Sequence, residues 1–187
     1  MIQPVLTRKG QPIETPPFIK MLFTDKRAAV LWLIVRVWLG WQWITSGFEK
    51  FENPAWMQTG EALKGFWTRV VQVPAEGRPP IAYDWYRDFI QSMLDSGAYV
   101  WFAKMIVFGE LIIGIALIAG LFIGVTAFFS GFMNWNFVMA GSASVNGVFL
   151  VLAFLLILAW KIAGYLGLDY FLLPRLAELW TPAKTSK

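Results

Sequence analysis

The feature that most constrains this chain is the near absence of charge from two long stretches. Residues 28 to 48 hold one charged side chain, Arg36, and residues 99 to 161 hold three, Lys104, Glu110 and the closing Lys161. Apolar runs of about 20 residues fold as membrane-spanning helices, because lipid offers the backbone no hydrogen-bond partner. With 57% hydrophobic and 15% charged residues, against roughly 25% charged in soluble proteins, the sequence predicts an integral membrane protein.

The apolar segments predict an all-α fold, an integral membrane four-helix antiparallel bundle in one domain. In chain order, the predicted parts are an N-terminal arm (1–27), span 1 (28–48), an outer loop (51–98), span 2 (99–122), span 3 (123–140), span 4 (148–168) and a C-terminal tail (169–187). Within the long loop, apolar residues at helical spacing predict two short amphipathic helices, over 59–73 and 83–97. The many Trp and Tyr residues of the loop are typical of segments at the level of lipid headgroups.

The distribution of positive charge predicts the orientation of the chain. Lys and Arg gather before span 1 and after span 4, whereas the loop holds more acids than bases. Cytoplasmic segments of membrane proteins carry an excess of Lys and Arg. We therefore expect a multi-pass protein of the cell (cytoplasmic) membrane, with both termini cytoplasmic and the loop outside.

Three charged residues lie within the predicted spans: Arg36, Lys104 and Glu110. Each costs about 2.5 to 3.5 kcal/mol on insertion scales, so each requires a partner or a wet cavity. Counted at ~1.5 Å per residue from the ends of their spans, Arg36 and Glu110 come to about the same depth, which predicts a buried ion pair. Such a pair either fixes the register of the helices or takes part in chemistry, and a buried ion pair by itself does not decide between these roles.

A second group of polar side chains is predicted in the outer half of the bundle. Lys104 comes to a depth similar to that of Trp43, Asn134 and Asn136, where the four could line a pocket for a quinone carbonyl or an anionic substrate. Lys104 could equally extend outward to the interface. Because Asn134 and Asn136 are about 200° apart around a helix axis, at most one of them faces such a pocket directly.

The residue types that are missing narrow the chemistry. The chain contains no Cys and no His, so we expect no haem, iron–sulfur cluster, zinc or other metal site. It has no Walker loop, no dinucleotide-binding fingerprint and no Ser-His-Asp set, and no catalytic residue can be assigned. A nucleic-acid partner is not expected either, because no basic stripe with interleaved aromatic residues is present.

Three local segments together resemble the DoxX family and its DoxD relatives. They are SGFEKF at 46–51 followed by Asn53-Pro54 and Trp56, GELIIG at 109–114, and NFVMAGS at 136–142 with GYLGLD at 164–169. The likeness spans roughly residues 26 to 176 and implies a four-helix membrane bundle in a redox setting. DoxD-type proteins form the large membrane subunit of a thiosulfate:quinone oxidoreductase, which passes electrons from thiosulfate to quinone and yields tetrathionate. The resemblance thus implies quinone and thiosulfate as partners, beside the lipid bilayer and other subunits of a membrane complex.

Two functions from different classes fit these observations. The first is a DoxX-like membrane subunit of a quinone-linked oxidoreductase, with Lys104, Asn134, Asn136 and Trp43 as its binding residues. The alternative is a non-catalytic accessory subunit that packs against a larger respiratory or photosynthetic electron-transfer complex. A small-solute transporter is disfavoured, because the sequence shows no internal repeat and no broken helix.

Overall fold

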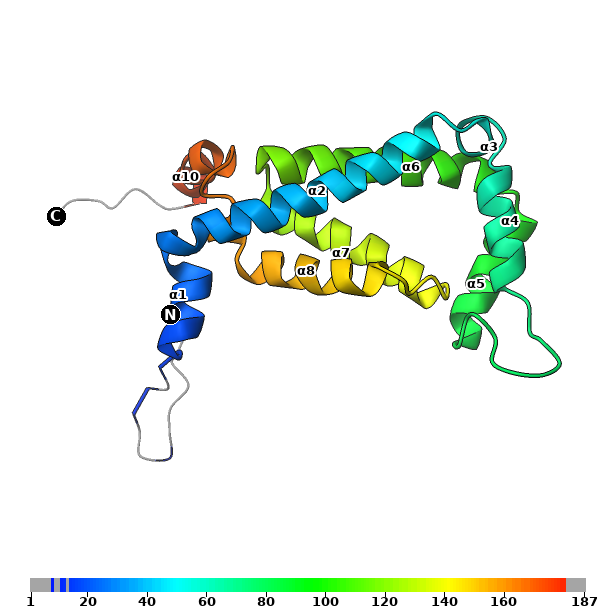
Figure 1. Cartoon of the computed structure of the whole chain (residues 1–187), viewed down its shortest axis with the longest axis horizontal. Coiled ribbons are helices and arrows are strands. Elements are labelled where there is room, and N and C mark those ends of the chain that lie inside the picture. Colours follow the sequence, from blue (N-terminus) through cyan, green and yellow to red (C-terminus); the bar gives the residue numbers. More distant parts are fainter. Residues whose placement is uncertain (1–7, 9–10, 13, 181–187) are drawn as a thin grey trace.

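The computed structural model describes residues 8, 11, 12 and 14–180, with side chains described up to 178. Within these residues the secondary structure is helical and contains no strand, which confirms the all-α class (Figure 1). The first residues of the predicted arm (1–7, 9, 10 and 13) and the last residues of the predicted tail (181–187) lie outside the described part of the chain.

Two of the described helices are long and apolar enough to cross a membrane. They are α2 (Ala29–Phe51), with the 3-10 turn η1 (Lys26–Ala28) before it, and α6 (Tyr99–Ala119). At a rise of ~1.5 Å per residue, α2 is about 34 Å long, against a hydrocarbon core of about 30 Å. Helices α7 (Ile123–Met139) and α8 (Asn146–Leu158) are shorter, with 17 and 13 residues.

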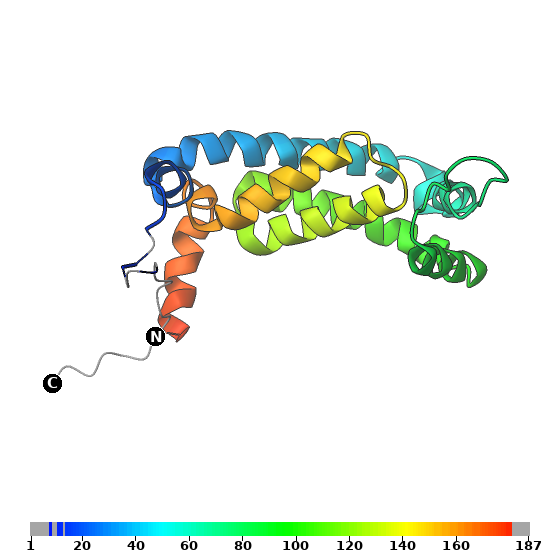
Figure 2. The ribbon, with the colours of Figure 1, turned by 90° about the horizontal axis from the view of Figure 1, so that it is seen from below.

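Helices α2, α6, α7 and α8 lie side by side along the long axis of the molecule (Figures 1 and 2). The α2–α6 contact is close because glycines face each other: a Cβ added at Gly114 would lie 2.7 Å from the Gly40 carbonyl oxygen. Small residues of this kind let two helix backbones touch and fix their register. The interior between the four helices is filled by Trp32, Leu39, Trp43, Ile113, Leu117, Ile123, Ala127 and Leu156.

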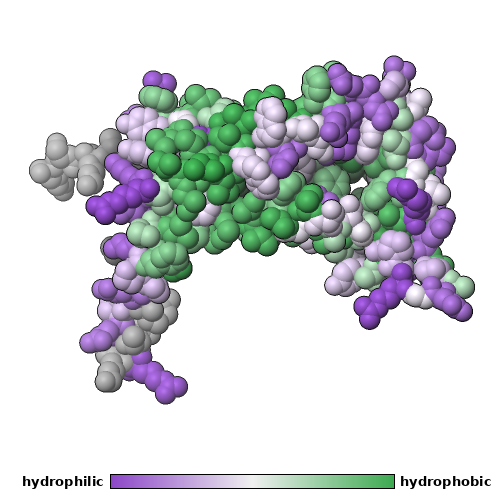
Figure 3. Space-filling view, viewed as in Figure 1, coloured by the Kyte–Doolittle hydropathy of each residue, from purple (hydrophilic) through white to green (hydrophobic). Residues whose placement is uncertain are grey.

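The outer faces of these four helices carry large exposed apolar side chains. Examples from the four helices are Ile34, Trp41, Ile112, Ile115, Val125, Phe128, Val151, Phe154 and Leu158. Figure 3 shows the result on one face, a hydrophobic middle between two hydrophilic ends. An apolar surface of this extent is the kind that lipid covers in membrane proteins.

Shorter helices cross the long axis at both ends of the molecule (Figures 1 and 2). One end holds α1 (Pro17–Thr24) and α10 (Asp169–Trp180), so the segments that lead to the two termini lie at the same end. The opposite end holds α3 (Pro54–Met57), α4 (Glu61–Val70) and α5 (Asp84–Asp95). Helices α4 and α5 fall within the two loop segments that the sequence predicts to be helical, whereas α1 and α3 were not predicted.

Helices α4 and α5 do not project freely from the bundle. They form a second apolar core with the N-terminal half of α6, built from Leu63, Trp67, Val70, Ile81, Tyr86, Ile90, Ala103 and Ile106. The turn between α3 and α4 also touches α6, since a Cβ added at Gly60 would lie 2.6 Å from the Tyr99 carbonyl oxygen. The loop is therefore a packed cap over one end of the bundle.

The predicted span 4, from 148 to 168, is wrong as a single helix. Helix α8 ends at Leu158, the short α9 covers Trp160–Ala163, and the chain then leaves the helix. The segment that follows is tied to the α6–α7 turn: the Leu168 N–H donates to the Ala119 carbonyl at 3.1 Å, and the Asp169 N–H donates to the Gly120 carbonyl at 2.9 Å. Amides committed to the α6–α7 turn cannot continue the hydrogen-bond ladder of their own helix.

Candidate functional site

A buried ion pair joins the C-terminal end of α2 to the middle of α6. The Lys50 ammonium lies 2.8 and 3.0 Å from the two carboxylate oxygens of Glu110. The Glu110 side chain is 1% exposed, whereas that of Lys50 is 21% exposed and so reaches the surface. The ammonium also donates to the Ser46 hydroxyl at 2.6 Å, and it lies 5.5 Å from the centroid of the Trp56 ring. This is a neutral but titratable cluster at the border of the apolar region.

Local sequence explains how these side chains meet. Ser46 and Lys50 are four residues apart on α2 and therefore lie on the same face of the helix. Gly47 lies between them, and a Cβ added there would come 3.1 Å from the Glu110 Cβ. Because Gly47 has no side chain, the Glu110 side chain can pack directly against α2. Trp56, from the short helix α3, then covers the ammonium.

This cluster has two chemical capabilities. A carboxylate beside an ammonium that reaches the surface can take up or release a proton, and such groups inside a membrane segment are rarely there without a function. The Lys50 ammonium and the Ser46 hydroxyl are N–H and O–H donors, the groups that bind a carbonyl oxygen or an oxyanion.

The predicted Arg36–Glu110 ion pair is wrong. Arg36 is buried, but its guanidinium donates to backbone carbonyls: Nη1 to Leu117 at 2.5 Å and to Ile118 at 2.7 Å, and Nη2 to Leu166 at 2.8 Å. Contacts between α2 and α6 place Arg36 against Gly120, whereas Glu110 lies against Gly47. The helix from Arg36 to Gly47 is about 16 Å long at ~1.5 Å per residue, so the two charges lie at different depths.

Arg36 belongs to a second polar cluster, at the end of the bundle near the termini. The buried Asp169 carboxylate accepts hydrogen bonds from the Phe122 N–H at 2.6 Å and the Ile123 N–H at 2.8 Å, at the start of α7. Arg36 and Asp169 thus hold the two sides of the α6–α7 turn. These contacts satisfy backbone groups at the end of α6, at the start of α7 and in the segment between α9 and α10, which assigns the cluster a structural role.

Two of the predicted pocket residues, Trp43 and Asn134, meet at one serine in the interior. The Trp43 indole N–H donates to the Ser130 hydroxyl at 2.8 Å, and the Asn134 amide nitrogen donates to the Ser130 carbonyl at 3.0 Å. All three residues are buried, and the Asn134 Oδ1 atom has no hydrogen-bond partner within the described chain. This atom is an acceptor, so it does not suit a quinone carbonyl, which is also an acceptor.

The structure does not bring Asn136 and Lys104 to that serine. The Tyr86 hydroxyl of α5 donates to the Asn136 side-chain oxygen at 3.1 Å, and the Asn136 amide nitrogen donates to the Phe132 carbonyl at 2.8 Å. Burial raises the pKa of Tyr86 to about 12, so this hydroxyl stays a donor over the physiological range. Lys104 is half-buried and makes no hydrogen bond or ion pair within the described chain. The four predicted residues therefore do not form one pocket.

The family model for DoxX matches residues 31–163, which is more than two thirds of the chain. The chain belongs to the DoxX family. The family resemblance predicted from the sequence is confirmed, and family membership together with the two long apolar helices indicates a membrane protein. No curated protein and no solved structure matches the chain.

Two of the segments that resemble the DoxX family also build the ion pair. The segments SGFEKF and GELIIG, which carry the resemblance, are the two that contribute Lys50 and Glu110 to the ion pair. Lys50 belongs to neither the ion pair nor the pocket predicted from the sequence, so its pairing with a residue inside span 2 was not foreseen. Within the described part of the chain, no group of three or more acidic side chains is placed to hold a metal ion.

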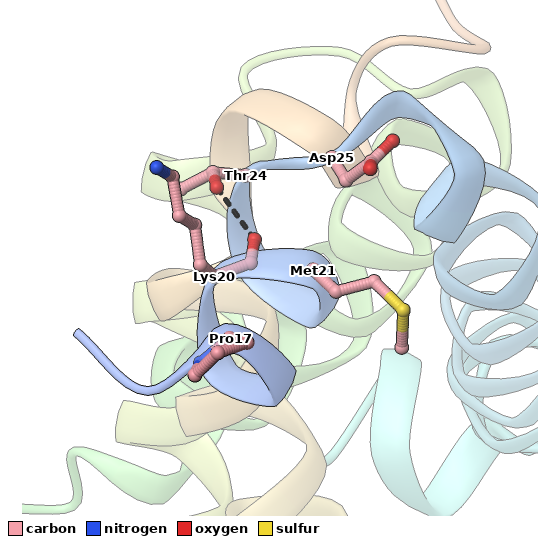
Figure 4. A pocket seen from close by; sticks show the side chains of 5 residues that line it. All are labelled: Pro17, Lys20, Met21, Thr24 and Asp25. Atoms are coloured by element: carbon pink, nitrogen blue, oxygen red, sulfur yellow. Dashed lines mark hydrogen bonds between the residues drawn. The ribbon is translucent and has the colours of Figure 1, made fainter.

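The hollows described on this DoxX protein lie at the end near the termini, not beside the predicted pocket residues. Figure 4 shows the first, a surface depression of about 420 Å³ along α1, lined by Pro17, Lys20, Met21, Thr24 and Asp25. Among its lining residues, the Thr24 hydroxyl donates to the Lys20 carbonyl, and the Asp25 N–H donates to the Met21 carbonyl at 3.3 Å. The second hollow lies beside the start of α10.

Proposed function

We propose that this DoxX protein crosses the cell membrane four times as an antiparallel bundle, with both termini in the cytoplasm. Two helices have the required length, and α7 and α8 lie beside them with exposed apolar faces of the same character. Helix α7, about 26 Å long at ~1.5 Å per residue, fits a bilayer that thins locally or whose polar side chains extend outward. The excess of Lys and Arg near both termini supports the orientation.

We further infer that the protein is the membrane subunit of a quinone-linked oxidoreductase of the thiosulfate:quinone type. The observation that carries this proposal is the Lys50–Glu110 pair, a titratable carboxylate buried beside a cation that reaches the outer surface. The site therefore moves from the predicted Lys104 and Asn136 to Lys50, Glu110 and Ser46. Lys104, which has no hydrogen bond within the described residues, remains available as a further cation.

The proposed reaction balances as two thiosulfate ions, one quinone and two protons giving one tetrathionate ion and one quinol. A sulfur–sulfur bond forms, the two thiosulfates together lose two electrons, and the quinone gains them. The Lys50 ammonium attracts the anionic donor or holds a quinone oxygen, and the Glu110 carboxyl supplies or relays a proton. Because the chain has no Cys, it offers no thiolate for a covalent sulfur intermediate. Electrons then pass between the two substrates directly or through a cofactor of a partner subunit.

The test is thiosulfate-dependent quinone reduction by the protein purified in mild detergent with everything that accompanies it. We expect Glu110→Gln and Lys50→Met to lower turnover at least tenfold while the protein remains folded. The control is Glu61→Gln, which removes the carboxylate of the exposed Lys64–Glu61 pair and should leave turnover unchanged. Wild-type turnover in both site variants would reject the proposed site. Absence of quinone from the purified chain, together with co-purified cofactor-bearing subunits, would favour the accessory-subunit function instead.

A further inference from the structure

The second hollow is an open surface depression walled by aromatic side chains. It has a volume of about 500 Å³ and lies at the corner where α10 leaves the bundle, against the end of α6. Three aromatic rings form its wall: Tyr165 and Tyr170 meet edge to face at 5.2 Å between centroids, and Tyr170 and Phe171 do so at 5.1 Å. Tyr170 and Phe171 are more than half exposed, so these rings are available to a ligand. The hollow thus offers a preformed and largely apolar surface.

A cation stands at the edge of the hollow. The Lys26 ammonium lies 5.1 Å from the centroid of the Tyr165 ring, a cation–π contact that holds it beside the aromatic wall. Lys26 takes part in none of the ion pairs found in the described part of the chain, and the neighbouring Arg27 side chain is exposed. The nearby Asp169 carboxylate is buried and already bonded to the α7 amides. The positive charge at this edge is therefore not neutralised by an ion pair.

The hollow lies where the apolar middle of the molecule gives way to its polar end. Helices α1 and α10 run across the long axis there, as helices at a membrane surface do (Figures 1 and 2). A ligand for this place needs an apolar part for the aromatic wall and a negative charge for Lys26. Phospholipids with an anionic headgroup have this combination, and the bilayer supplies them at this level.

We propose that the hollow bounded by Tyr165, Tyr170 and Phe171 binds one anionic phospholipid, with its phosphate at Lys26 and its upper acyl chain against the rings. A bound lipid would link η1 of the N-terminal segment to α10 of the C-terminal segment. The proposal goes beyond the redox function and does not depend on it, because neither Lys50 nor Glu110 takes part. A failure of thiosulfate-dependent turnover would leave this site untouched.

The test is native mass spectrometry of the full-length protein, released from micelles that contain equal amounts of phosphatidylglycerol and phosphatidylcholine. We expect the wild-type protein to retain phosphatidylglycerol severalfold over phosphatidylcholine. Lys26→Gln should reduce that preference to near parity, and Tyr170→Ala should reduce retention of both lipids. The matched control is Lys64→Gln, because Lys64 lies 5.2 Å from the Tyr99 ring centroid at the opposite end, a similar contact with no hollow described beside it.

A second measurement guards against variants that do not fold. Phosphatidylglycerol added to wild-type protein in phosphatidylcholine micelles should raise the melting temperature, and the Lys26→Gln protein should lose that increase. Parity between the two lipids in the wild-type protein, or no increase in its melting temperature, would overturn the proposal. An equal loss of preference in Lys64→Gln would also overturn it, since overall charge would then explain the binding.

Discussion

Loss of Lys50 from the Lys50–Glu110 pair should destabilise the protein more than loss of Glu110. Breaking a buried ion pair by removing one partner costs about 3 to 5 kcal/mol, because the other charge is left buried. Lys50→Met leaves the Glu110 carboxylate, 1% exposed, without its ammonium, so we expect a loss near the lower limit, about 3 kcal/mol. Glu110→Gln leaves an ammonium that is 21% exposed and keeps its Ser46 acceptor, so we expect about 1 kcal/mol.

The assay is reversible unfolding of the purified protein in mixed micelles, with the free energy of unfolding measured for both single variants and the double variant. The double variant should lose less than the sum of the single losses, because it leaves no stranded charge. The matched control is the exposed Lys64–Glu61 pair, with a distance of 3.1 Å and side chains 42% and 57% exposed. The same cycle on that pair should give a coupling of at most about 0.5 kcal/mol. Equal losses for Lys50→Met and Glu110→Gln, or a coupling no larger than in the control, would refute the reasoning.

Three further predictions concern helix contacts, a helix cap and a buried hydroxyl. Gly114→Ala should destabilise the protein by about 2 kcal/mol, because the added Cβ would lie 2.7 Å from the Gly40 carbonyl oxygen. Gly109→Ala should be neutral or stabilise by about 0.5 kcal/mol, because its Cβ would meet its nearest neighbour at 3.4 Å. Thermal unfolding of the two variants tests this difference. Asp169→Ala should destabilise the protein by about 2 kcal/mol and speed amide exchange at the start of α7. Hydrogen-exchange mass spectrometry measures this rate, and unchanged exchange would contradict the capping role. Tyr86→Phe should cost about 1 kcal/mol near neutral pH. Because burial raises the pKa of Tyr86 from 10.0 to about 12, its contribution is complete below pH 10 and is lost as the pH rises through 12. Between pH 10 and 12, the melting temperature of Tyr86→Phe should fall less with pH than that of the wild-type protein. Identical slopes would contradict the prediction.

The helical class and the position of the apolar segments could be predicted from sequence because lipid imposes one rule on every residue of a span. The partner of Glu110 could not be predicted in the same way. Depths counted from span ends assume that the spans begin in one plane, but α6 starts at Tyr99, which lies against Gly60 and so beyond the end of α2. That offset moves Glu110 away from Arg36 and toward Lys50.

Side-chain bonds to the backbone set a second limit on prediction. Arg36 donates to the Leu117, Ile118 and Leu166 carbonyls. Because every residue has a backbone carbonyl, the amino-acid sequence does not indicate which of them will accept from a buried arginine. For Asn134 and Asn136, helical periodicity gave a correct prediction of side-chain direction. It predicted that they face different ways, and the structure places the first at Ser130 and the second at Tyr86.

The α6–α7 turn receives its counter-charges from two other helices, Arg36 from α2 and Asp169 from α10. A helix has partial negative charge at its C-terminal end and partial positive charge at its N-terminal end. The guanidinium of Arg36 meets the first at the end of α6, and the carboxylate of Asp169 meets the second at the start of α7. A hairpin tip whose helix dipoles are compensated by these two side chains relies less on water for its backbone groups, which suits a turn at the edge of the apolar region.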